Sequence, residues 1–543
     1  MLVDVNRKRN YLQIIDCQIH YKISIMSDSK VRVRFVTQHK AYAVSDAPFA
    51  VPYKLTRNGL SKVVNHLLNN VTADEEDEVG SGEVSFDFLV HNRLIRSSLD
   101  KVISSMKLST EDIITVEYFP SISVSKESKS CDMPAWVGCM NTNLASDGLI
   151  VAGCYDGMVR LVDATEIVPL KMQTPGSKSS NNTVDSSITM SSRPQHEGPI
   201  KDICAFSHQS HYFVVSCGKD QRMKCFMSGK KNSGVSKGGV SRSVAPFREV
   251  ASLCGHMSSV ECLDVYSGGG DSLCLASGGY DGNVFGYQLL DACSGFASAD
   301  GVAPSSKSTP GKKTKLNSGA SSSSSLEVAS LSPSFHVHAH AQVVSDLQLC
   351  CIGGSAEGPT SPTHMFTSSF DHSLKLWDLA HMDNISTFNT AKVVTSLHYS
   401  PVNKLILTSH TDDKIRLFDP NSKSVVAEDI SHSNLNGSCV KTFGVAPSVN
   451  SKMPPQWVSQ VRWHPTSANV FASVDYSGAV KLWDMRTLNV PLYTLKSAHE
   501  GKGLCIDWVC HSDTNASIVS GGSDCCVKSL GISDLDSLAE QEA

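Results

Sequence analysis

The sequence lacks the short motifs by which most catalytic sites are recognised. It contains no G-x-S-x-G nucleophile elbow, no phosphate-binding loop and no H-E-x-x-H metal motif. It also contains no C-x-x-C pair, and many of its 18 cysteines fall inside expected strands. We therefore interpret the cysteines as buried thiols of a reducing compartment. These absences argue against an enzyme, and we expect no bound cofactor.

The chain also has little net charge and no long apolar run. A formal charge of −5 on 543 residues gives no overall attraction to nucleic acid. Basic residues precede apolar ones near the N-terminus, but Asp16 and Lys22 interrupt the apolar run, so we expect no targeting segment or membrane span there. We expect residues 1–29 to be a disordered extension, with Met26 opening the folded protein, and residues 536–543 to be a short tail.

What the sequence does contain is a repeat, seen most clearly in the stretch MFTSSFDHSLKLWD at 365–378. A strand ends in small residues, Asp371 occupies a turn, and an alternating strand returns to Trp377. This pattern predicts a β-hairpin. Aspartate suits the turn because its carboxylate can accept backbone N–H groups and a hydrogen bond from a histidine one strand away.

The same frame recurs in seven hairpins. Six have aspartate in the turn, at Asp156, Asp220, Asp281, Asp371, Asp412 and Asp524. The sixth hairpin along the chain instead has Ser477 there, followed by a complete Trp483-Asp484 ending. Histidines precede several hairpins, at His196, His256, His340, His432 and His499. Histidine in one turn and aspartate in the next hairpin resemble WD-repeat proteins, which form β-propellers. Because the pairs recur from blade to blade, we assign them a structural role and not a catalytic one.

Seven frames predict a seven-bladed propeller over residues 131–535. Insertions rich in Ser, Gly and Thr interrupt it, and we expect them to be mobile because they bury little apolar surface. They lie near 165–194, 229–246, 292–334 and 433–456, and the last has more apolar residues that could pack partly on the propeller. Residues 121–130 form a linker in which SISV at 121–124 is the candidate strand for closing the ring. GKKTK at 311–315 is interpreted as a solvated loop, with nuclear import or RNA contact as the alternative.

Residues 30–120 follow a different pattern. Strands are expected at 31–37, 42–44, 84–90 and 113–118, and helices at 60–69 and 99–106. This order predicts an α+β ubiquitin-like domain, or β-grasp, in front of the all-β propeller. The acidic run at 74–78 falls in an apparent insertion and is interpreted as a solvated loop.

Three stretches of this domain carry a family resemblance: KLTRNGLSKVVNHLL at 54–68, FDFLVHNRLIRSSL at 86–99 and LSTEDIITVEY at 108–118. They resemble the ubiquitin-like domain of the WD-repeat ribosome-biogenesis factors of the PeBoW complex. The resemblance implies a non-catalytic scaffold of large-subunit (pre-60S) maturation and rRNA processing, located in the nucleus, nucleolus and nucleoplasm. It implies pescadillo and block-of-proliferation homologues as partners of the propeller. It implies no membrane partner, and it leaves direct RNA contact open.

The resemblance also assigns a role to one acidic residue. In that family the ubiquitin-like domain docks on the metal-ion-dependent adhesion site of midasin, an AAA ATPase, and one acidic side chain completes the coordination of the metal. Glu111 stands at the matching place, and Mg²⁺ is a hard cation that accepts a carboxylate oxygen. Asp112 is the neighbouring alternative. Spacing alone favours a solvated or capping role for Glu111 after Ser109-Thr110, and the metal contact is what the resemblance implies.

Other interpretations remain open. A Notchless-type pre-60S factor resembles this chain in its ubiquitin-like domain but has eight blades, and a substrate receptor of a ubiquitin ligase would bind degrons on the propeller. His336, His338 and His340 alternate and could share one face as zinc ligands. No fourth ligand is evident and His340 already belongs to the blade pattern, so we expect no zinc site.

Overall fold

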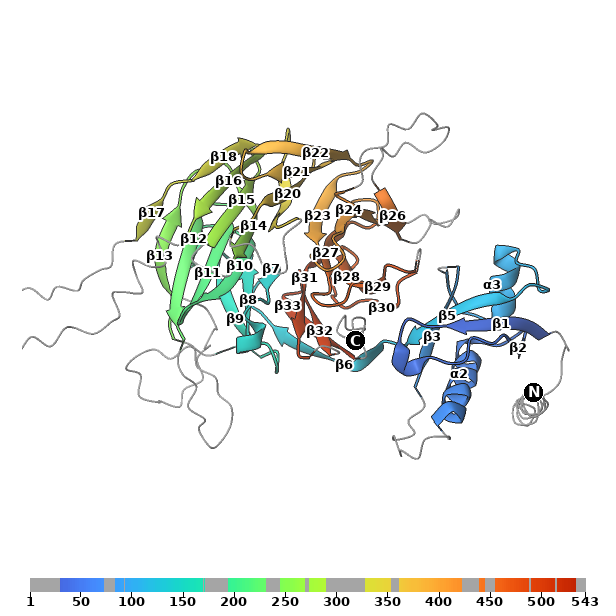
Figure 1. Cartoon of the computed structure of the whole chain (residues 1–543). Coiled ribbons are helices and arrows are strands. Elements are labelled where there is room, and N and C mark those ends of the chain that lie inside the picture. The colour runs from blue at the N-terminus through green and yellow to red at the C-terminus, as the bar shows by residue number, and fades with distance from the viewer. Residues whose placement is uncertain are drawn as a thin grey trace, which may run out of the picture. The chain divides into compact units, whose positions relative to one another are not determined.

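A computed structural model describes residues 30–72, 84–91, 93–168, 170, 194–230, 245–268, 273–289, 328–352, 361–421, 439–444, 455–487, 490–512 and 515–533. The chain divides into two compact units, Met1–Ser121 and Ile122–Ala543, each drawn in Figure 1. No helix in the described ranges is long and apolar enough to cross a membrane.

The first unit is a five-stranded sheet with two α-helices. The strand order is β2-β1-β5-β3-β4, in which β1 and β5 are parallel and the other pairs are antiparallel. This mixed sheet, interrupted by one long helix, is the expected ubiquitin-like arrangement. Its elements are β1 (Lys30–Val36), η1 (Lys40–Tyr42), β2 (Phe49–Pro52), α2 (Arg57–Thr72), β3 (Phe86–Val90), β4 (Arg93–Leu94), α3 (Leu99–Met106) and β5 (Ile114–Pro120).

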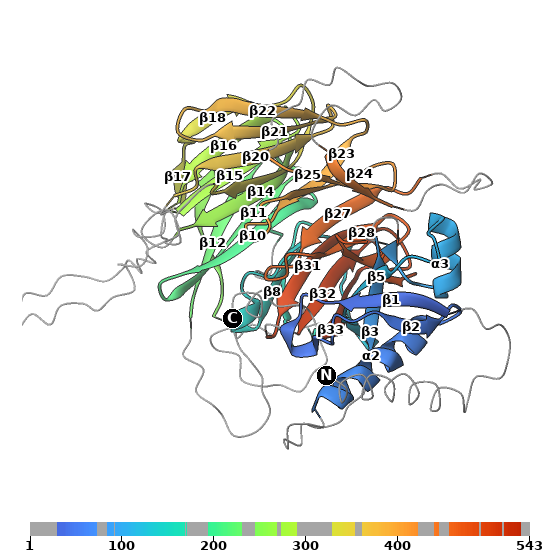
Figure 2. The ribbon, with the colours of Figure 1, turned by 45° about the vertical axis from the view of Figure 1, so that its right-hand side comes forward.

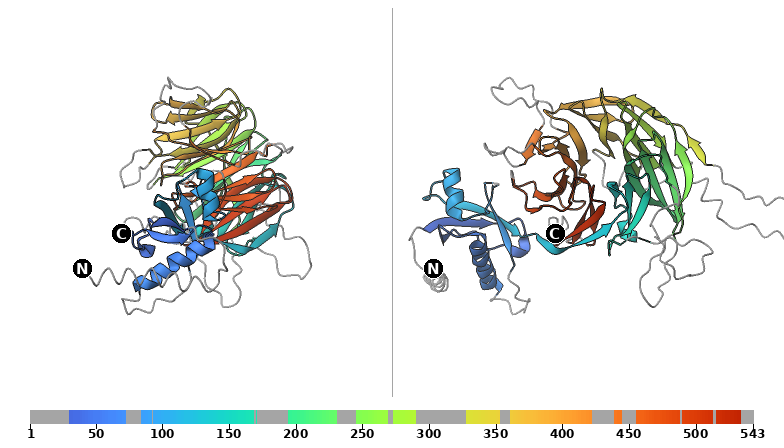
Figure 3. Two further views of the ribbon diagram at one scale, coloured as in Figure 1. Left: turned by 90° about the vertical axis from the view of Figure 1, so that its right-hand side faces the viewer. Right: turned by 180° about the vertical axis from the view of Figure 1, so that it is seen from behind.

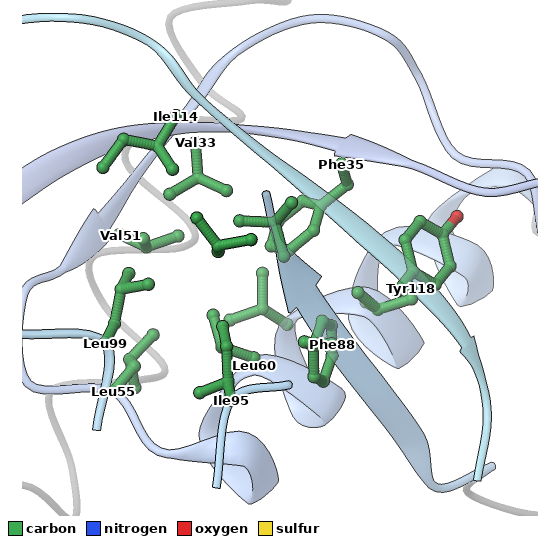
Figure 4. Close-up of a cluster of buried hydrophobic side chains, with 14 of the residues drawn as sticks. Val33, Phe35, Val51, Leu55, Leu60, Phe88, Ile95, Leu99, Ile114 and Tyr118 are labelled. Atoms are coloured by element: carbon green, nitrogen blue, oxygen red, sulfur yellow. The ribbon is translucent and has the colours of Figure 1, made fainter. Parts of the chain in front are cut away.

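The core of this unit lies between the sheet and its helices (Figure 4). Alternate residues of β1 are buried, and Val33 and Phe35 point to the same side as Leu60 of α2. The aromatic rings of Phe35 and Tyr118 meet edge to face with centroids 6.1 Å apart. The alternate buried residues of the strand therefore pack against the apolar face of the helix, as the sequence predicts.

The strand expected at 42–44 was predicted wrongly. The second strand of the sheet is β2 at 49–52, and residues 40–42 form a 3-10 turn. The phenol of Tyr118 explains the difference, because it donates to Tyr42 O at 2.5 Å and accepts from Val44 N at 3.2 Å. This side chain satisfies the backbone of 42–44, so the segment needs no partner strand.

The second unit is a seven-bladed propeller, as the seven hairpin frames predict. Its blades follow one another around a central axis, and Figures 1, 2 and 3 show them from several sides. Blade one contains β7 (Val137–Asn141), β8 (Leu149–Cys154) and β9 (Val159–Asp163), with η2 (Ala145–Asp147) between β7 and β8; blade two contains β10 (Ile200–His208), β11 (His211–Gly218), β12 (Met223–Gly229) and β13 (Arg248–Leu253).

Blade three contains β14 (Val260–Ser267), β15 (Leu273–Gly279), β16 (Asn283–Gln288) and β18 (Phe335–His338); blade four contains β19 (Val344–Cys350), β20 (His364–Ser369), β21 (Ser373–Asp378) and β22 (Asp383–Asn389).

Blade five contains β23 (Val394–Tyr399), β24 (Ile406–His410), β25 (Ile415–Phe418) and β26 (Cys439–Phe443); blade six contains β27 (Val458–Trp463), β28 (Val470–Asp475), β29 (Val480–Asp484) and β30 (Tyr493–Leu495); blade seven contains β31 (Gly503–Cys510), β32 (Ala516–Gly522) and β33 (Cys526–Ser533).

The ring is closed by a strand from the beginning of the unit. Strand β6 (Ser123–Asp132) pairs antiparallel with β33 and supplies the outer strand of blade seven. The innermost strand of blade one, β7, contacts both β31 and β10, so the first blade lies between the last and the second. Pairing the last strand with one from the start of the unit covers the outer edge of β33, which would otherwise be unpaired.

Two segments expected to lie in mobile insertions are ordered strands. Strand β17 (Ala329–Leu331), from the 292–334 insertion, pairs in parallel with β13 and adds a fifth strand to blade two. Strand β26, from the 433–456 insertion, is the outer strand of blade five, and its Phe443 is fully buried. The first was expected to be a mobile loop, and that expectation was wrong because a few apolar residues suffice to complete a sheet edge. The second agrees with the apolar residues of 433–456, which were expected to allow partial packing on the propeller.

Candidate functional site

The loop carrying Glu111 is held by its backbone and leaves its side chains exposed. Helix α3 ends at Lys107 in a left-handed conformation, with Leu108 N donating to Ile103 O at 3.1 Å. The Arg32 guanidinium, on β1, donates to the carbonyl oxygen of Glu111. Ser109 Oγ accepts from Glu111 N at 3.2 Å. The backbone position of Glu111 is thus fixed from both the helix and the sheet.

The carboxylate of Glu111 is exposed and makes no hydrogen bond or ion pair with any residue that the structure describes. Asp112 and Ile113 beside it are also exposed, and Ile113 is 40% accessible, which is unusual for isoleucine in a strand-entry loop. Strand β5 starts at the next residue and occupies the centre of the sheet. A carboxylate on a fixed loop with free oxygens can coordinate a hard metal ion carried by another molecule.

In the propeller, blade four contains the most complete blade network. His340 Nδ1 lies 3.0 Å from Asp371 Oδ2, and His340 Nε2 lies 2.8 Å from Thr367 Oγ1. Trp377 Nε1 donates to the same hydroxyl at 2.9 Å. Burial lowers the pKa of His340, and Asp371 acts against that effect. The chain of contacts joins strands β20 and β21 to the β20–β21 turn and to the turn that precedes β19, and every member is satisfied.

The histidines of blades two, three and seven lie at different distances from their aspartates. His196 lies 2.9 Å from Asp220 in blade two, and His499 lies 2.8 Å from Asp524 in blade seven. In blade three, His256 and Asp281 are 3.6 Å apart, too far for a good hydrogen bond, although His256 Nε2 reaches Ser277 Oγ at 2.9 Å. His432 lies outside the described residues, as do the acidic run 74–78 and the basic run 311–315.

The aspartates of blades one and five have arginine partners. Asp156 pairs with Arg160, and Asp412 pairs with Arg416, each four residues further along its hairpin. The sequence analysis did not anticipate these partners. The signal was the same D-x-x-x-R spacing in two frames that lack a preceding histidine.

In blade six, where Ser477 stands at the turn position, another residue supplies the carboxylate. Asp475, two residues before Ser477, accepts from Ser477 N at 2.9 Å and Ala479 N at 3.2 Å, and Lys481 Nζ lies 2.9 Å from its Oδ2. Trp483 Nε1 donates to Ser473 Oγ at 2.9 Å. The carboxylate is therefore present in this blade but comes from a shifted position in the sequence.

The three alternating histidines of 336–340 do not form a metal site. His336 stacks on Phe285 with ring centroids 4.5 Å apart, and His338 Nδ1 lies 3.0 Å from Asn283 Oδ1. His340 turns into the blade-four network. Within the part of the chain that the structure describes, no group of three or more His, Cys, Asp or Glu side chains is arranged to hold a metal ion.

A set of acids on the innermost strands, of which Asp346 is buried and the others are partly buried, was not found from the sequence. Asp202, Asp264, Asp346 and Asp507 each accept a backbone N–H from the next blade, those of Leu263, Leu349, Leu397 and Thr142 respectively. Burial raises the pKa of Asp202 to about 7, with Asp346 adding to the effect, and raises the pKa of Asp264 to about 6. The Arg462 guanidinium lies 3.7 Å from Asp346 Oδ2. These contacts connect neighbouring blades near the centre of the ring.

Comparison with known proteins agrees with both units. Residues 31–103 match the NLE (NUC135) domain family, and residues 188–226, 247–287, 382–419 and 438–484 match the WD domain, G-beta repeat. Three similar curated proteins carry the name Ribosome biogenesis protein WDR12 homolog. That of Dictyostelium discoideum is 28% identical over 92% of this chain and 94% of its own length. That of Anopheles gambiae is 28% identical over 93% and 96%, and that of Oryza sativa subsp. japonica is 27% identical over 91% and 95%.

The matches cover the ubiquitin-like unit and the propeller in the same order and leave less than a tenth of either chain unaligned. Together with the seven blades and the domain that precedes them, these matches show a chain with an NLE-like N-terminal domain and WD repeats, similar over more than nine tenths of its length to proteins named Ribosome biogenesis protein WDR12 homolog.

Proposed function

We propose that the protein is a non-catalytic scaffold of ribosome biogenesis that acts on the large-subunit precursor in the nucleus, nucleolus and nucleoplasm. The propeller binds homologues of pescadillo and block-of-proliferation. The ubiquitin-like unit offers Glu111 to a metal ion held by a midasin-type AAA ATPase. The role in ribosome biogenesis draws on the names of the similar proteins, and the finer assignments draw on the family resemblance of residues 54–118.

The observation that carries the proposal is the state of Glu111. Its backbone is tied to Arg32 and Ser109, whereas its carboxylate is exposed and has no partner among the described residues. A capping or structural acid would have its oxygens engaged. A free carboxylate in a fixed position instead suits a metal that lacks one ligand, because little ordering is needed on binding.

The blade count favours this proposal over a Notchless-type factor. The described residues of the second unit form seven sheets, and a Notchless-type propeller has eight blades. A ubiquitin-ligase receptor is a less favoured alternative because it leaves the exposed Glu111 without a role.

In this proposal the two units bind different partners, and the protein transmits force between them. If the propeller is anchored in the precursor and the ATPase grips the ubiquitin-like unit, force from ATP hydrolysis pulls the subcomplex away. Loss of the Glu111 contact then leaves the subcomplex intact on the precursor. Such a variant is dominant, because it still occupies the position of the parent.

The test is a metal-dependent pull-down of the adhesion domain of a midasin-type ATPase by the full chain. With Mg²⁺ present the parent binds, and chelation abolishes binding. Glu111→Ala and Glu111→Gln lose binding because no anionic oxygen remains, and Glu111→Asp weakens it because its reach is one methylene shorter. Asp46→Ala, which removes an 80% exposed acid of the same unit, serves as the matched control. Binding by Glu111→Ala at parental strength, or binding insensitive to chelation, contradicts the proposal and turns attention to Asp112.

A further inference from the structure

One backbone hydrogen bond recurs in six blades and defines a common face of the propeller. It runs from the residue after the second strand to the residue just before the innermost strand. The donor and acceptor pairs are Tyr155 and Trp136, Lys219 and Pro199, Tyr280 and Ser259, Phe370 and Val343, Tyr476 and Trp457, and Ser523 and Lys502. Because the positions are equivalent from blade to blade, these residues surround the same end of the central channel.

This face carries the largest exposed apolar side chains of the described propeller. Met257, Tyr280, Trp136 and Trp457 are 89%, 60%, 47% and 43% exposed. Trp136 packs against Tyr155 with ring centroids 5.4 Å apart. Scattered exposed apolar residues are ordinary on a protein surface, but exposed tryptophans gathered on one face mark an interaction site.

A cavity of about 500 Å³ adjoins this aromatic surface between blades one and two. Tyr155, which packs on Trp136, also forms part of the cavity wall, so the two features are continuous. Other wall residues include Gln195, the cationic Arg222 and Lys224, and three acids, Asp156, Glu197 and Asp220.

Gln195 is the unusual wall residue. It is only 5% exposed, and its Oε1 accepts from Val159 N at 2.8 Å. Its Nε2, however, is buried and has no hydrogen-bond partner among the residues described. A buried donor left unpaired is unfavourable, because the desolvation of the amide is not repaid by a hydrogen bond. An oxygen acceptor entering the cavity recovers that cost.

The charges of the wall select the kind of acceptor. Asp156 is already bound by Arg160, and Asp220 by His196, so neither acid is free to attract a cation. Arg222 is exposed and forms no ion pair with a described residue. Lys224 is engaged by Glu249 at 3.6 Å. The donors left to bind an acceptor are therefore the Gln195 amide and the Arg222 guanidinium, which together match a carboxylate, with the exposed Glu197 beside them.

We propose that this face binds an extended segment of a partner protein, which inserts an aspartate or glutamate side chain into the cavity beside Gln195 and Arg222 and lays flanking apolar residues on Trp136. The carboxylate accepts from Gln195 Nε2 and pairs with Arg222. This goes beyond the proposed function, because it assigns a surface and a ligand chemistry that need neither the ATPase nor Glu111.

A single acidic side chain fits better than a nucleic-acid strand. Glu197 is exposed at the cavity and Glu500 is exposed in the equivalent turn of blade seven. These acids repel a chain that carries a charge at every residue more than they repel a segment with a single carboxylate beside Arg222. Bases stacking on Trp136 and Trp457 are the competing interpretation, and the test includes them.

The test uses an array of twelve-residue peptides in matched pairs that differ only by Glu or Gln at a central position. The full chain is applied to the array, and the strongest pairs are remeasured in solution by fluorescence polarisation. We expect the Glu member to bind at least ten-fold more tightly than the Gln member. A parent chain that binds no peptide, or binds both members equally, overturns the proposal.

Variants locate the binding on this face. Gln195→Glu keeps the acceptor for Val159 N but replaces the free donor by a repelling carboxylate, and Arg222→Glu reverses the charge of the wall. Each should weaken the Glu peptides ten-fold or more, and Trp136→Ala should weaken both members. Arg248→Glu on β13 and Ile385→Ala on β22 are controls with exposed side chains elsewhere on the propeller, and they should bind as the parent does.

Two further measurements separate the outcomes. Melting temperatures report whether Gln195→Glu folds, and if it does not, the exposed Arg222 and Trp136 variants decide alone. A single-stranded oligouridylate that binds in place of the peptides, with the same dependence on Trp136 and Arg222, overturns the proposal in favour of RNA. Glu111→Ala should bind the peptides as the parent does, so failure of the ATPase contact and failure of this site are distinguishable.

Discussion

Arg160 holds Asp156 with two parallel hydrogen bonds across the turn of blade one, from Nη1 to Oδ1 at 2.9 Å and from Nη2 to Oδ2 at 2.5 Å. The Arg160 side chain is only 3% exposed. Arg416 repeats this arrangement on Asp412 in blade five, at 3.2 and 2.6 Å. These two blades therefore fix the turn with a guanidinium from the same hairpin, where blades two, four and seven use a histidine from the preceding turn.

The first prediction follows from that geometry. Burial favours the neutral form of Asp156, but the hydrogen bonds from Arg160 hold the pKa of this carboxyl below its ordinary value. Arg160→Lys keeps the charge and loses the planar double contact, so we expect a loss of about 1–3 kcal/mol in the free energy of unfolding. Urea denaturation measures it. Arg248→Lys, on the exposed surface of β13, is the matched control and should change stability by less than about 0.5 kcal/mol. An equal effect of the two variants contradicts the role of the double contact.

The second prediction compares two blades. Ser477 in the turn of blade six suggests from sequence that this blade lacks its carboxylate and is locally weaker, but Asp475 supplies one and is only 2% exposed. Asp475→Ala should therefore cost about as much as Asp371→Ala in blade four, on the order of 1–3 kcal/mol, because each leaves buried donors unpaired. Native-state hydrogen exchange should show β28 and β20 similarly protected in the parent. Much faster exchange in β28 than in β20 would instead support the expectation from the sequence, that blade six is locally weaker.

The sequence predicted the hairpins better than their partners. The spacing from Asp371 to Trp377 is local, so a hairpin can be recognised wherever the frame recurs. The partner of each aspartate is not local in the same way: Asp475 lies two residues out of frame, and Arg160 takes the place of a distant histidine. Hairpin spacing thus fixes the number of blades but not the network within each.

The inter-blade contacts of Asp202, Asp264, Asp346 and Asp507 could not be predicted, because the next blade supplies their backbone partners and is in place only in the closed ring. Asp202 lies in a strand that alternates like any other, and only the approach of blade three makes Leu263 N its partner. The strand expected at 42–44 was wrong for a similar reason. The side chain that binds this segment, Tyr118, is 76 residues from Tyr42 in the sequence. Glu111 is a candidate only through resemblance to known sequences, because exposure alone does not distinguish it from other acids.

The third prediction concerns pH. In the folded protein the pKa of Asp202 is about 7, whereas in the unfolded chain it is about 3.9. Between these values the folded state binds a proton that the unfolded chain releases, so the contribution of Asp202 to stability is full below pH 4 and is lost as pH rises through 7. Asp202→Asn removes this dependence. We expect the parent to lose on the order of 1–3 kcal/mol more than the variant between pH 5 and pH 8.

Buried histidines do not obscure that comparison. Burial lowers the pKa of His340 and His499, so the unfolded chain takes up their protons first and stability falls as pH drops below about 6.5. This opposite trend is the same in the parent and in Asp202→Asn, and it cancels in the difference. Guanidinium denaturation at five pH values measures both slopes, with Asp46→Asn as the exposed control. Identical slopes for parent and Asp202→Asn would show that Asp202 is ionised throughout.

The last prediction concerns the residue that positions Glu111. Arg32 is exposed on β1, and its guanidinium donates to the Glu111 carbonyl oxygen, so Arg32→Met releases the loop without touching the Glu111 side chain. Because Arg32 is at the surface, the free energy of unfolding should change by less than about 1 kcal/mol. Amide exchange at Asp112 and Ile113 should quicken, and binding to the metal-loaded adhesion domain should weaken about three- to ten-fold, since the loop must then be ordered on binding.

Two comparisons make this prediction specific to position. Arg32→Lys retains a donor and should recover part of the binding, and Arg34→Met removes an arginine from the same strand whose partner is Asp46, 3.7 Å away, so it should bind as the parent does. The exchange measurement needs no ATPase, so it tests the Arg32 contact even if Glu111 has another role. If Arg32→Met leaves both exchange and binding unchanged, the Glu111 loop is positioned by Ser109 and the cap of α3 alone, and Arg32 has no part in presenting the carboxylate.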